Sequence, residues 1–444
     1  MKDHKVFIRI GLLSLMFTAW PALAATNPAP SGAPLSLAQA IDMAISASPK
    51  RQAAEAQLDQ DSAKRREALS GLGPKLRGDY TAARFDKPVD VAFGPQAFTL
   101  RPDELREGSL TLSQPVTGFY GAYEKAGIAR TQRDRSAMGL DQAKANAAFA
   151  AAEAYRRAQQ ADEFVRIAQG SIASTESQAK DGDALAKSGR LIRSDLLKIK
   201  IAQQDARAQL ARSVAGQKKA RERLLYALGL PHGENPQLDP LPNAANIRAY
   251  VPPAYQGAVD QASNARLDVK QASLGVEQAE YVSSLAHFRF APDINLFLKW
   301  ERIYSPPPFG NPDFTRSYGV TASWDIWDNG AKVFVSQQAA AETLKAQTAL
   351  TEAKDKMHLE LEGLLVDFDA AKETLLAAEA SVAAAEEAYR LDKARFGSGL
   401  VTTTDLLLSE NSQTKARGAL VTAAVEADLM RLGIEQALGE KKPK

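Results

Sequence analysis

Hydrophobic and polar residues alternate along four short stretches of the chain. The pattern is clearest in residues 294–300 and 318–327, where Ile, Leu, Val, Trp and other apolar residues occupy every second position. Residues 75–85 and 109–116 carry a weaker copy, separated by a long polar loop. A period of two predicts strands with one apolar and one mostly polar face. We therefore expect two strand hairpins, with strands at about residues 74–85, 108–116, 292–304 and 317–327.

Most of the remaining chain has the composition of long helices, because it is rich in Ala and nearly free of Pro. The expected helices lie at residues 35–69, 121–187, 194–228, 255–286, 330–396 and 404–438. At a rise of 1.5 Å per residue, the two longest would each reach about 100 Å. Residues 229–255 contain six prolines and predict an irregular connector.

The two halves of the chain repeat one pattern at a fixed spacing. Gly189 and Gly399 are 210 positions apart, and so are Asp195 and Asp405. Each Asp opens a helical run that ends in Ala-Leu-Gly, again at the same spacing. A constant spacing without insertion or deletion predicts an internal duplication.

Each half therefore reads as helix, strand hairpin, long helix, turn and helix. We expect residues 25–444 to form one duplicated body, with halves at 35–229 and 255–439 and a linker at 230–254. Two half-units of this kind normally fuse into a single body, so the length of the chain does not imply several domains.

The segment from each Gly to the following Asp predicts a tight turn between two long helices. A Gly at the end of a helix commonly adopts a left-handed conformation. A carboxylate in the first turn of a helix is favoured by the helix dipole. For Asp195 and Asp405, two interpretations stay open: helix capping alone, or capping together with a role in a pore.

Residues 1–24 match a secretory signal. A basic start is followed by an apolar stretch at 10–20 and by the small-residue cleavage site Ala22-Leu23-Ala24. The alternative, a membrane anchor, is disfavoured because the apolar stretch is shorter than the ~20 residues that a spanning helix needs. No Cys follows the cleavage site to accept a lipid. We expect the mature chain to leave the cytoplasm.

Composition argues against several classes of function. The chain has 55 basic and 53 acidic residues, and removal of the signal leaves 52 of each, which gives no support for nucleic-acid binding. Cys is absent, and the four His residues show no ligand spacing, so we expect no disulfide and no metal site. Without a phosphate loop or nucleophile motif, we expect no enzyme and no cofactor.

The expected strands are about ten residues long, the length of a tilted strand that crosses a bilayer. A four-stranded sheet has two open edges, which lipid does not tolerate, so several copies must close it. Three copies would supply twelve strands. The aromatic residues Trp300, Tyr304, Trp324 and Trp327, at expected strand ends, would form the aromatic belt. Alternatively, they are core residues of a soluble sheet, although no segment remains to cover its second face.

The order of the elements, the export signal and the duplication resemble the TolC family of outer-membrane efflux and secretion ducts. So does the segment Arg395-Phe396-Gly397-Ser398-Gly399, followed by Asp405-Leu406-Leu407. The resemblance covers nearly the whole mature chain. It implies a mainly α fold with a transmembrane β part: a homotrimer whose β-barrel lies in the outer membrane and joins a periplasmic α-helical barrel.

The resemblance also implies that the turns dock on a periplasmic adaptor (membrane fusion) protein, which serves an inner-membrane pump. The residues that correspond to the docking tips are Gly189, Arg190, Leu191, Arg193, Ser194, Phe396, Gly397, Gly399, Leu400 and Thr403. In the family, an acidic residue after the tip lines the closed aperture, and Asp195 and Asp405 occupy that position.

The chain departs from the best-known member of the family at two tip positions. Leu408 replaces a second acidic residue, and Val401 replaces an Arg. We therefore expect the aperture to be closed by a different set of contacts, with Arg190 and Arg193 as candidates.

The function that these features favour is a passive exit duct of a tripartite efflux pump or a type I secretion system, opened by docking of an adaptor. The alternative is a soluble periplasmic coiled-coil scaffold or adaptor protein, which needs no lipid-facing strands. The alternation in residues 294–300 and 318–327 favours the duct.

Overall fold

A computed structural model describes residues 34–94, 96–305 and 312–440. The expected signal at residues 1–24 lies outside these ranges. The described residues from Leu35 onward form one compact unit. None of the helices in the described ranges is long and apolar enough to span a bilayer.

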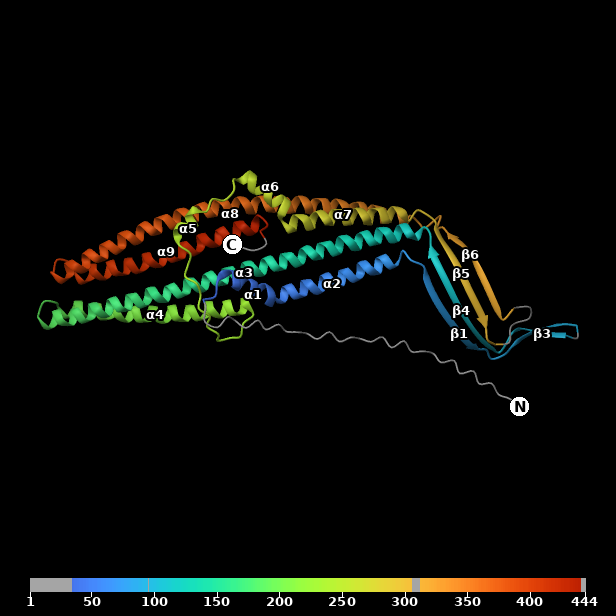
Figure 1. Cartoon of the computed structure of the whole chain (residues 1–444), viewed down its shortest axis with the longest axis horizontal. Coiled ribbons are helices and arrows are strands. Elements are labelled where there is room, and N and C mark those ends of the chain that lie inside the picture. The colour runs from blue at the N-terminus through green and yellow to red at the C-terminus, as the bar shows by residue number, and fades with distance from the viewer. Residues whose placement is uncertain (1–33, 95, 306–311, 441–444) are drawn as a thin grey trace, which may run out of the picture. The chain divides into compact units, whose positions relative to one another are not determined.

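The first half of the unit contains four helices and four strands (Figure 1). In chain order they are α1 (Leu37–Ala47), α2 (Pro49–Ser70), β1 (Lys75–Arg84), β2 (Val89–Phe93), β3 (Gln96–Arg101), β4 (Glu104–Pro115), α3 (Gly118–Lys187) and α4 (Arg193–Leu228). The segment between the expected strands was predicted to be a polar loop, but β2 and β3 form an additional hairpin there.

The connector and the second half follow the same order. They contain α5 (Ala244–Ala249), α6 (Tyr255–Ala265), α7 (Leu267–Phe288), β5 (Asp293–Ile303), β6 (Phe314–Ser323), α8 (Ala331–Gly397) and α9 (Thr403–Ala437). The helix α5 lies within the connector, which was expected to be irregular.

The prediction of one continuous helix at the start of each half was wrong. Ser48 breaks the first helix with an extended backbone (φ −61°, ψ 118°), and its hydroxyl accepts from the Arg51 N–H at 3.3 Å. Pro49 explains this break, because the residue before a proline avoids the α conformation. Arg266, 218 positions later, breaks the second helix in the same way without a proline (φ −61°, ψ 131°).

Close helix packing depends on small residues. The helix α3 packs against α2, α4, α7 and α9, while α8 packs against α7 and α9. Where α3 crosses α7, a Cβ added at Gly127 would lie 2.6 Å from the Tyr281 ring, so only glycine allows this approach. Ala148, Ala151 and Ala152 of α3 are fully buried. The Ala-rich composition thus lets α3 contact several helices along its length.

The strands form one antiparallel sheet in the order β1–β4–β5–β6. In its register, Leu110 lies opposite both Gly78 and Trp300, and Trp300 lies opposite Arg316. Because side chains alternate along each strand, this register places the even-numbered residues of all four strands on one face. That face carries the apolar residues Leu76, Tyr80, Leu110, Leu112, Ile294, Leu296, Leu298, Trp300, Tyr318 and Val320.

The other face of the sheet is polar. Its odd-numbered residues include Arg77, Asp79, Thr81, Glu107, Ser109, Thr111, Asn295, Lys299, Glu301, Thr315, Ser317 and Thr321. Among the residues that the structure describes, β1 and β6 have no second strand partner. The sheet therefore has one apolar face, one polar face and two open edges.

Candidate functional site: the paired helix turns

The first turn connects α3 to α4 through a left-handed glycine. Gly189 has φ +71°, its N–H donates to the Ala186 carbonyl, and the Arg190 N–H donates to the Leu185 carbonyl. This pair of bonds satisfies carbonyls that the end of a helix leaves free. The predicted left-handed conformation of Gly189 is confirmed.

The second turn, between α8 and α9, has the same geometry. Gly399 has φ +75°, its N–H donates to the Phe396 carbonyl, and the Leu400 N–H donates to the Arg395 carbonyl. A Cβ added at Gly189 or Gly399 would meet no atom within 4 Å. Glycine is therefore required at these turns by its backbone conformation and not by crowding.

Asp195 lies in the first turn of α4 and is paired with a lysine. Lys198 donates to Asp195 Oδ1 at 2.9 Å and to Thr404 Oγ1 of α9 at 3.4 Å. The Asp195 side chain retains 24% exposure. Lys198 thus links the acidic residue of one turn to the helix that follows the other turn.

Asp405 takes part in a helix cap. The Thr402 hydroxyl accepts from the Asp405 N–H at 3.2 Å and donates to Asp405 Oδ2 at 2.7 Å. Asp405 is exposed to solvent in the single chain. Capping is therefore part of the role of Asp405, and its exposed carboxylate leaves the pore interpretation open.

The two turns also touch directly. The Arg190 guanidinium donates to the Gly397 carbonyl at 3.3 Å. Arg193 is exposed, and among the described residues its side chain makes no hydrogen bond or ion pair with the other turn. Of the two arginines considered as candidates for closing contacts, Arg190 is thus the one that bridges the turns within the described chain.

Apolar side chains project from both turns. Leu400 is 77% exposed and Ile192 is 65% exposed, and Leu408, one turn into α9, is 64% exposed. Thr403, which the resemblance to the TolC family places in the docking tip, is only 2% exposed within the single chain. It opens α9, where the helix packs against its neighbours.

Of the four predicted belt residues, Tyr304, Trp324 and Trp327 lie just past the ends of strands. Trp300 lies within β5, opposite Leu110, and not at the strand end as predicted. Tyr304 follows the end of β5, and its ring centroid is 6.4 Å from that of Tyr80. Trp324 and Trp327 follow β6 at the end near the helices, with exposures of 58% and 82%.

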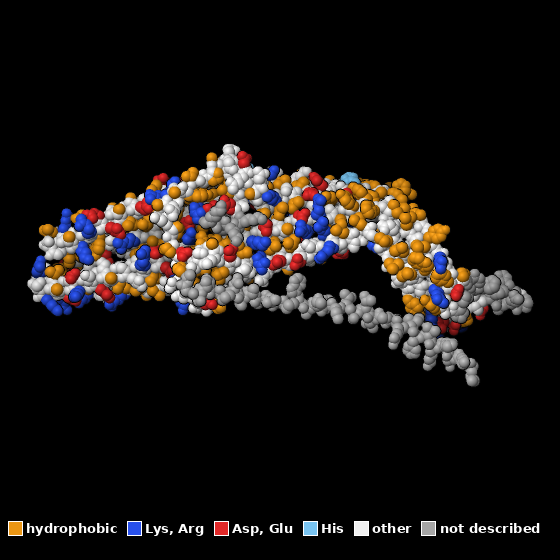
Figure 2. Space-filling model, in the orientation of Figure 1, with side chains coloured by type: hydrophobic (Ala, Val, Ile, Leu, Met, Phe, Trp, Pro, Cys, Tyr) orange, Lys and Arg blue, Asp and Glu red, His pale blue; other side chains and the backbone are white. Residues whose placement is uncertain are grey.

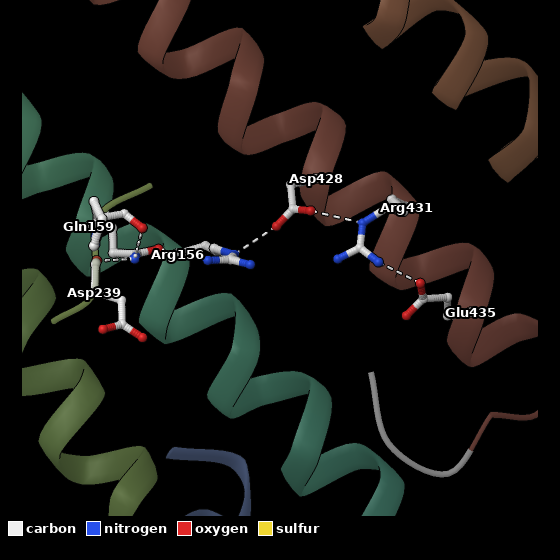
Figure 3. A network of polar contacts seen from close by, with 7 residues as sticks. Arg156, Gln159, Asp239, Asp428, Arg431 and Glu435 are labelled. Atoms are coloured by element: carbon white, nitrogen blue, oxygen red, sulfur yellow. Dashed lines mark hydrogen bonds and ion pairs between the residues drawn. The ribbon is translucent and has the colours of Figure 1, made fainter. Parts of the chain in front are cut away.

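A buried ionic network that the sequence did not indicate joins the two halves (Figure 3). Arg156 of α3 donates to Asp428 of α9 at 2.7 Å, and Arg431 donates to the same carboxylate at 2.9 Å. Gln159 donates to the carbonyls of Asp239 and Pro240 in the connector. The only signal in the sequence is the spacing of Asp428, Arg431 and Glu435 along one helix face, which is equally typical of an exposed face.

A second buried cluster lies closer to the turns. Ser171 donates to Glu410 Oε1 at 3.2 Å, and Gln178 donates to Glu410 Oε2 at 3.4 Å and to the Tyr389 hydroxyl at 3.1 Å. Burial raises the pKa of Glu410, and hydrogen bonds from Ser171 and Gln178 and the charge of Lys393 offset part of that rise. The Glu410 carboxyl thus connects α9 with α3, and Gln178 in turn connects α3 with Tyr389 of α8.

The described part of the chain has no group of three or more His, Asp or Glu side chains arranged to hold a metal ion. The features that stand out are the turns, the two-faced sheet and the buried contacts between the halves.

Residues 258–440 match the model of the outer membrane efflux protein family. The whole fold is similar to that of CusC, with a TM-score of 0.79 and 16% identity over 91% of this chain and 92% of that one. The predicted resemblance of the chain to the TolC family of channels is confirmed.

Other outer-membrane proteins have a fold similar to that of this chain. VceC from Vibrio cholerae gives a TM-score of 0.75 at 18% identity, over 91% of this chain and 96% of that one. The open state of the MtrE channel from Neisseria gonorrhoeae gives a TM-score of 0.77 at 18% identity, over 92% of this chain and 90% of that one. No curated protein matches the sequence. The family is one of channels and not of enzymes, and the soluble scaffold is not favoured.

Proposed function

We propose that this protein forms a homotrimeric exit duct for efflux or secretion, which is passive and is opened by a periplasmic adaptor. The observation that carries the proposal is the register of the sheet. It brings the apolar residues of four strands onto one face and leaves β1 and β6 unpaired. Such a sheet is suited to lipid on one side and water on the other, provided that its edges are closed.

Closure by identical copies fits the strand directions. Adjacent strands are antiparallel throughout, so β1 and β6 of one chain run in opposite directions. The β6 strand of one copy can therefore pair with β1 of the next in the same antiparallel pattern. Three copies close a twelve-stranded barrel, an even number as in other outer-membrane barrels.

The turns are suited to partner docking. They are adjacent, are bridged by Arg190 and Gly397, and expose Ile192 and Leu400. An adaptor that binds both turns could separate them and open the aperture. This role extends to the other exposed residues of the predicted tips, with Thr403 excluded. The pump behind the adaptor belongs to a tripartite efflux or type I secretion system.

Disulfide trapping tests the closure, because the native chain contains no Cys. Thr81→Cys on β1 is combined in turn with Thr315→Cys, Ser317→Cys and Thr321→Cys on β6. All four positions lie on the polar face, and one register should bring a pair within disulfide reach. We expect covalent trimers after oxidation in membranes.

Thr81→Cys combined with Asn295→Cys is the control, because β5 lies inside the sheet and should not meet the next copy. The native protein in mild detergent should also have the mass of a trimer. A water-soluble monomer, or cross-linking that stops at dimers, contradicts the barrel.

A further inference from the structure

Aromatic side chains cover one surface of the helices just beyond the sheet. Phe119 and Tyr123, in the first two turns of α3, are 51% and 58% exposed, and Tyr120 beside them is 44% exposed. Phe290, just past the end of α7, is 46% exposed. We call these four residues the aromatic collar. Figure 2 shows hydrophobic side chains gathered over the sheet and the adjoining ends of the helices.

The collar lies on the opposite side of α3 from the polar interior. Gly118, Gly121 and Lys125 line a cavity of about 1490 Å³. The cavity is also lined by Lys75 and Asp293 of the sheet. Residues of a helix are ~100° apart, so Tyr123 and Lys125 point in nearly opposite directions.

A neighbouring copy is poorly placed to cover the collar. Next to the sheet, the helices form a row in which α3 contacts α2 and α7, and α7 contacts α8. The helices α3 and α7 are therefore flanked on both sides by helices of their own chain. Another copy that pairs with β1 or β6 would approach the row at α2 or α8, leaving the outer surface of α3 free.

The collar is continuous with the apolar face of the sheet. The indole N–H of Trp324, which follows β6, donates to the Phe290 carbonyl at 3.1 Å. The Tyr120 ring lies 4.8 Å from the Phe288 ring at the end of α7. These two contacts join the aromatic residues at the helix ends to each other and to the segment that follows β6.

Charged groups mark the end of the collar along α3. Between Phe119 and Arg130, the charged residues are Glu124, which is 5% exposed, and Lys125, which lines the cavity. Arg130 is the next one, and it donates to the Tyr281 hydroxyl at 3.0 Å and is ion-paired with Glu277. Along α3, the outer surface thus changes with distance from the sheet: it is apolar over the sheet, aromatic at the collar and charged from Arg130 onward.

We propose that the interfacial layer of the bilayer, on the side of the helices, extends beyond the strands and surrounds the aromatic collar. The helix α3 rises ~7.5 Å from Gly118 to Tyr123. The headgroup region on each side of a bilayer is about 5–8 Å thick. Tyr and Trp favour this depth because their rings are apolar and their polar ends reach water. The collar thus anchors the helices to phospholipid; this inference rests on the proposed barrel, whose apolar face meets lipid.

Quenching by spin-labelled lipids tests the proposal. Single variants Tyr123→Cys, Lys125→Cys and Tyr318→Cys are labelled with bimane and placed in phosphatidylcholine vesicles. One set of vesicles carries a nitroxide on the headgroup, and another carries it in the acyl chain. We expect the headgroup nitroxide to quench the label at 123 several-fold more than the label at 125.

The label at 318 separates the collar from the barrel. Tyr318 lies on the apolar face of β6 and should be quenched by the acyl-chain nitroxide. If 318 is quenched while 123 and 125 respond alike, the collar is wrong and the barrel stands. If 318 is not quenched, the barrel itself fails.

Two further measurements keep the test decisive. If Tyr123→Cys does not assemble, Phe119→Cys replaces it, with Ala122→Cys of the cavity lining as its control. Pyrene attached at position 123 should show no excimer emission. Excimer emission would mean that another copy covers the collar and would overturn the proposal.

Discussion

The guanidinium of Arg156 donates to the carboxylate of Asp428 at 2.7 Å, although the two residues lie 272 positions apart. Arg156 is 8% exposed and Asp428 is 1% exposed. The pair joins the long helix of the first half to the last helix of the second. It lies beside the contact of Gln159 with the connector carbonyls, so three segments meet there.

Removal of Arg156 should destabilise the protein far more than removal of an exposed arginine. Arg156→Met leaves Asp428 buried with Arg431 as its remaining partner, and breaking a buried pair costs about 3 kcal/mol. Arg166→Met is the control, because the Arg166 side chain is 78% exposed in its pair with Glu163 and such pairs contribute about 0–1 kcal/mol. The thermal stability of the two variant trimers is compared in detergent by circular dichroism. Equal losses of stability in Arg156→Met and Arg166→Met would contradict a structural role for the Arg156–Asp428 pair.

Replacement of the turn glycines should abolish export while trimers remain in the membrane. Gly189→Val and Gly399→Val force a β-branched residue into positive φ, which costs of order 1 kcal/mol or more and reshapes each turn. Gly363→Ala in α8 is the control, because a Cβ there meets no atom within 4 Å. Export by cells and the trimer content of membranes are measured. Unchanged export in the double valine variant would argue against docking at the turns.

The acidic residues after the turns should favour cations at the aperture. In a trimer, Asp195 and Asp405 each occur three times around the axis, and rings of carboxylates attract cations. Asp405→Ala should lower cation preference in planar bilayers, and Asp195→Ala/Asp405→Ala should lower it further. The preference should weaken with salt, because the Debye length is about 8 Å at physiological ionic strength.

A cap variant separates charge from capping at this position. Thr402→Val removes the hydroxyl that caps α9 but keeps the Asp405 carboxylate. It should cost about 1 kcal/mol of stability. It should also leave ion selectivity unchanged. If Asp405→Ala keeps the native selectivity and conductance, the aspartate is a helix cap alone.

The buried carboxyl of Glu410 should make stability fall as pH rises. Burial raises the pKa of Glu410 above its unfolded value of about 4.3, so the folded state binds its proton more tightly. Stability is therefore greatest below the unfolded pKa and declines until pH passes the raised folded pKa. Glu410→Gln should be more stable than the native protein at pH 7, and the difference should shrink at pH 4.

The control for Glu410 is an exposed carboxylate of the neighbouring helix. Glu387 is paired with Arg390, whose hydrogen bond lowers the pKa of Glu387. Glu387→Gln should therefore gain no stability at pH 7. The thermal unfolding midpoints of the native, Glu410→Gln and Glu387→Gln trimers are compared between pH 4 and pH 8. If stability depends on pH in Glu410→Gln as it does in the native protein, the Glu410 carboxyl is not the source of that pH dependence.

Local features of the structure could be predicted from the sequence. The alternation in residues 294–300 is a property of neighbouring residues, and β5 occupies Asp293–Ile303. The glycines at 189 and 399 needed positive φ, and they have it. The family resemblance followed from the same local motifs and the spacing between them.

Other features depended on contacts between distant segments. No proline in the sequence indicates the helix break at Arg266. Arg266 is instead ion-paired with Asp268 and with Glu360 of α8. The sequence places Thr403 beside the second turn, but packing against neighbouring helices buries its side chain. In the sequence, the aromatic residues from Phe119 to Tyr123 indicated only the start of a helix.

The sequence by itself determined the four strands of the main sheet, the turns at Gly189 and Gly399, the internal duplication and the resemblance to a family of outer-membrane channels. These properties follow from local periodicity and backbone preference, which act over a few residues. Tertiary structure alone decided that Arg156 meets Asp428, that Glu410 is buried against Gln178, and that Tyr123 faces outward while Lys125 lines a cavity. Burial and pairing of charges depend on which helix faces meet, and a single helix pattern fits several such arrangements.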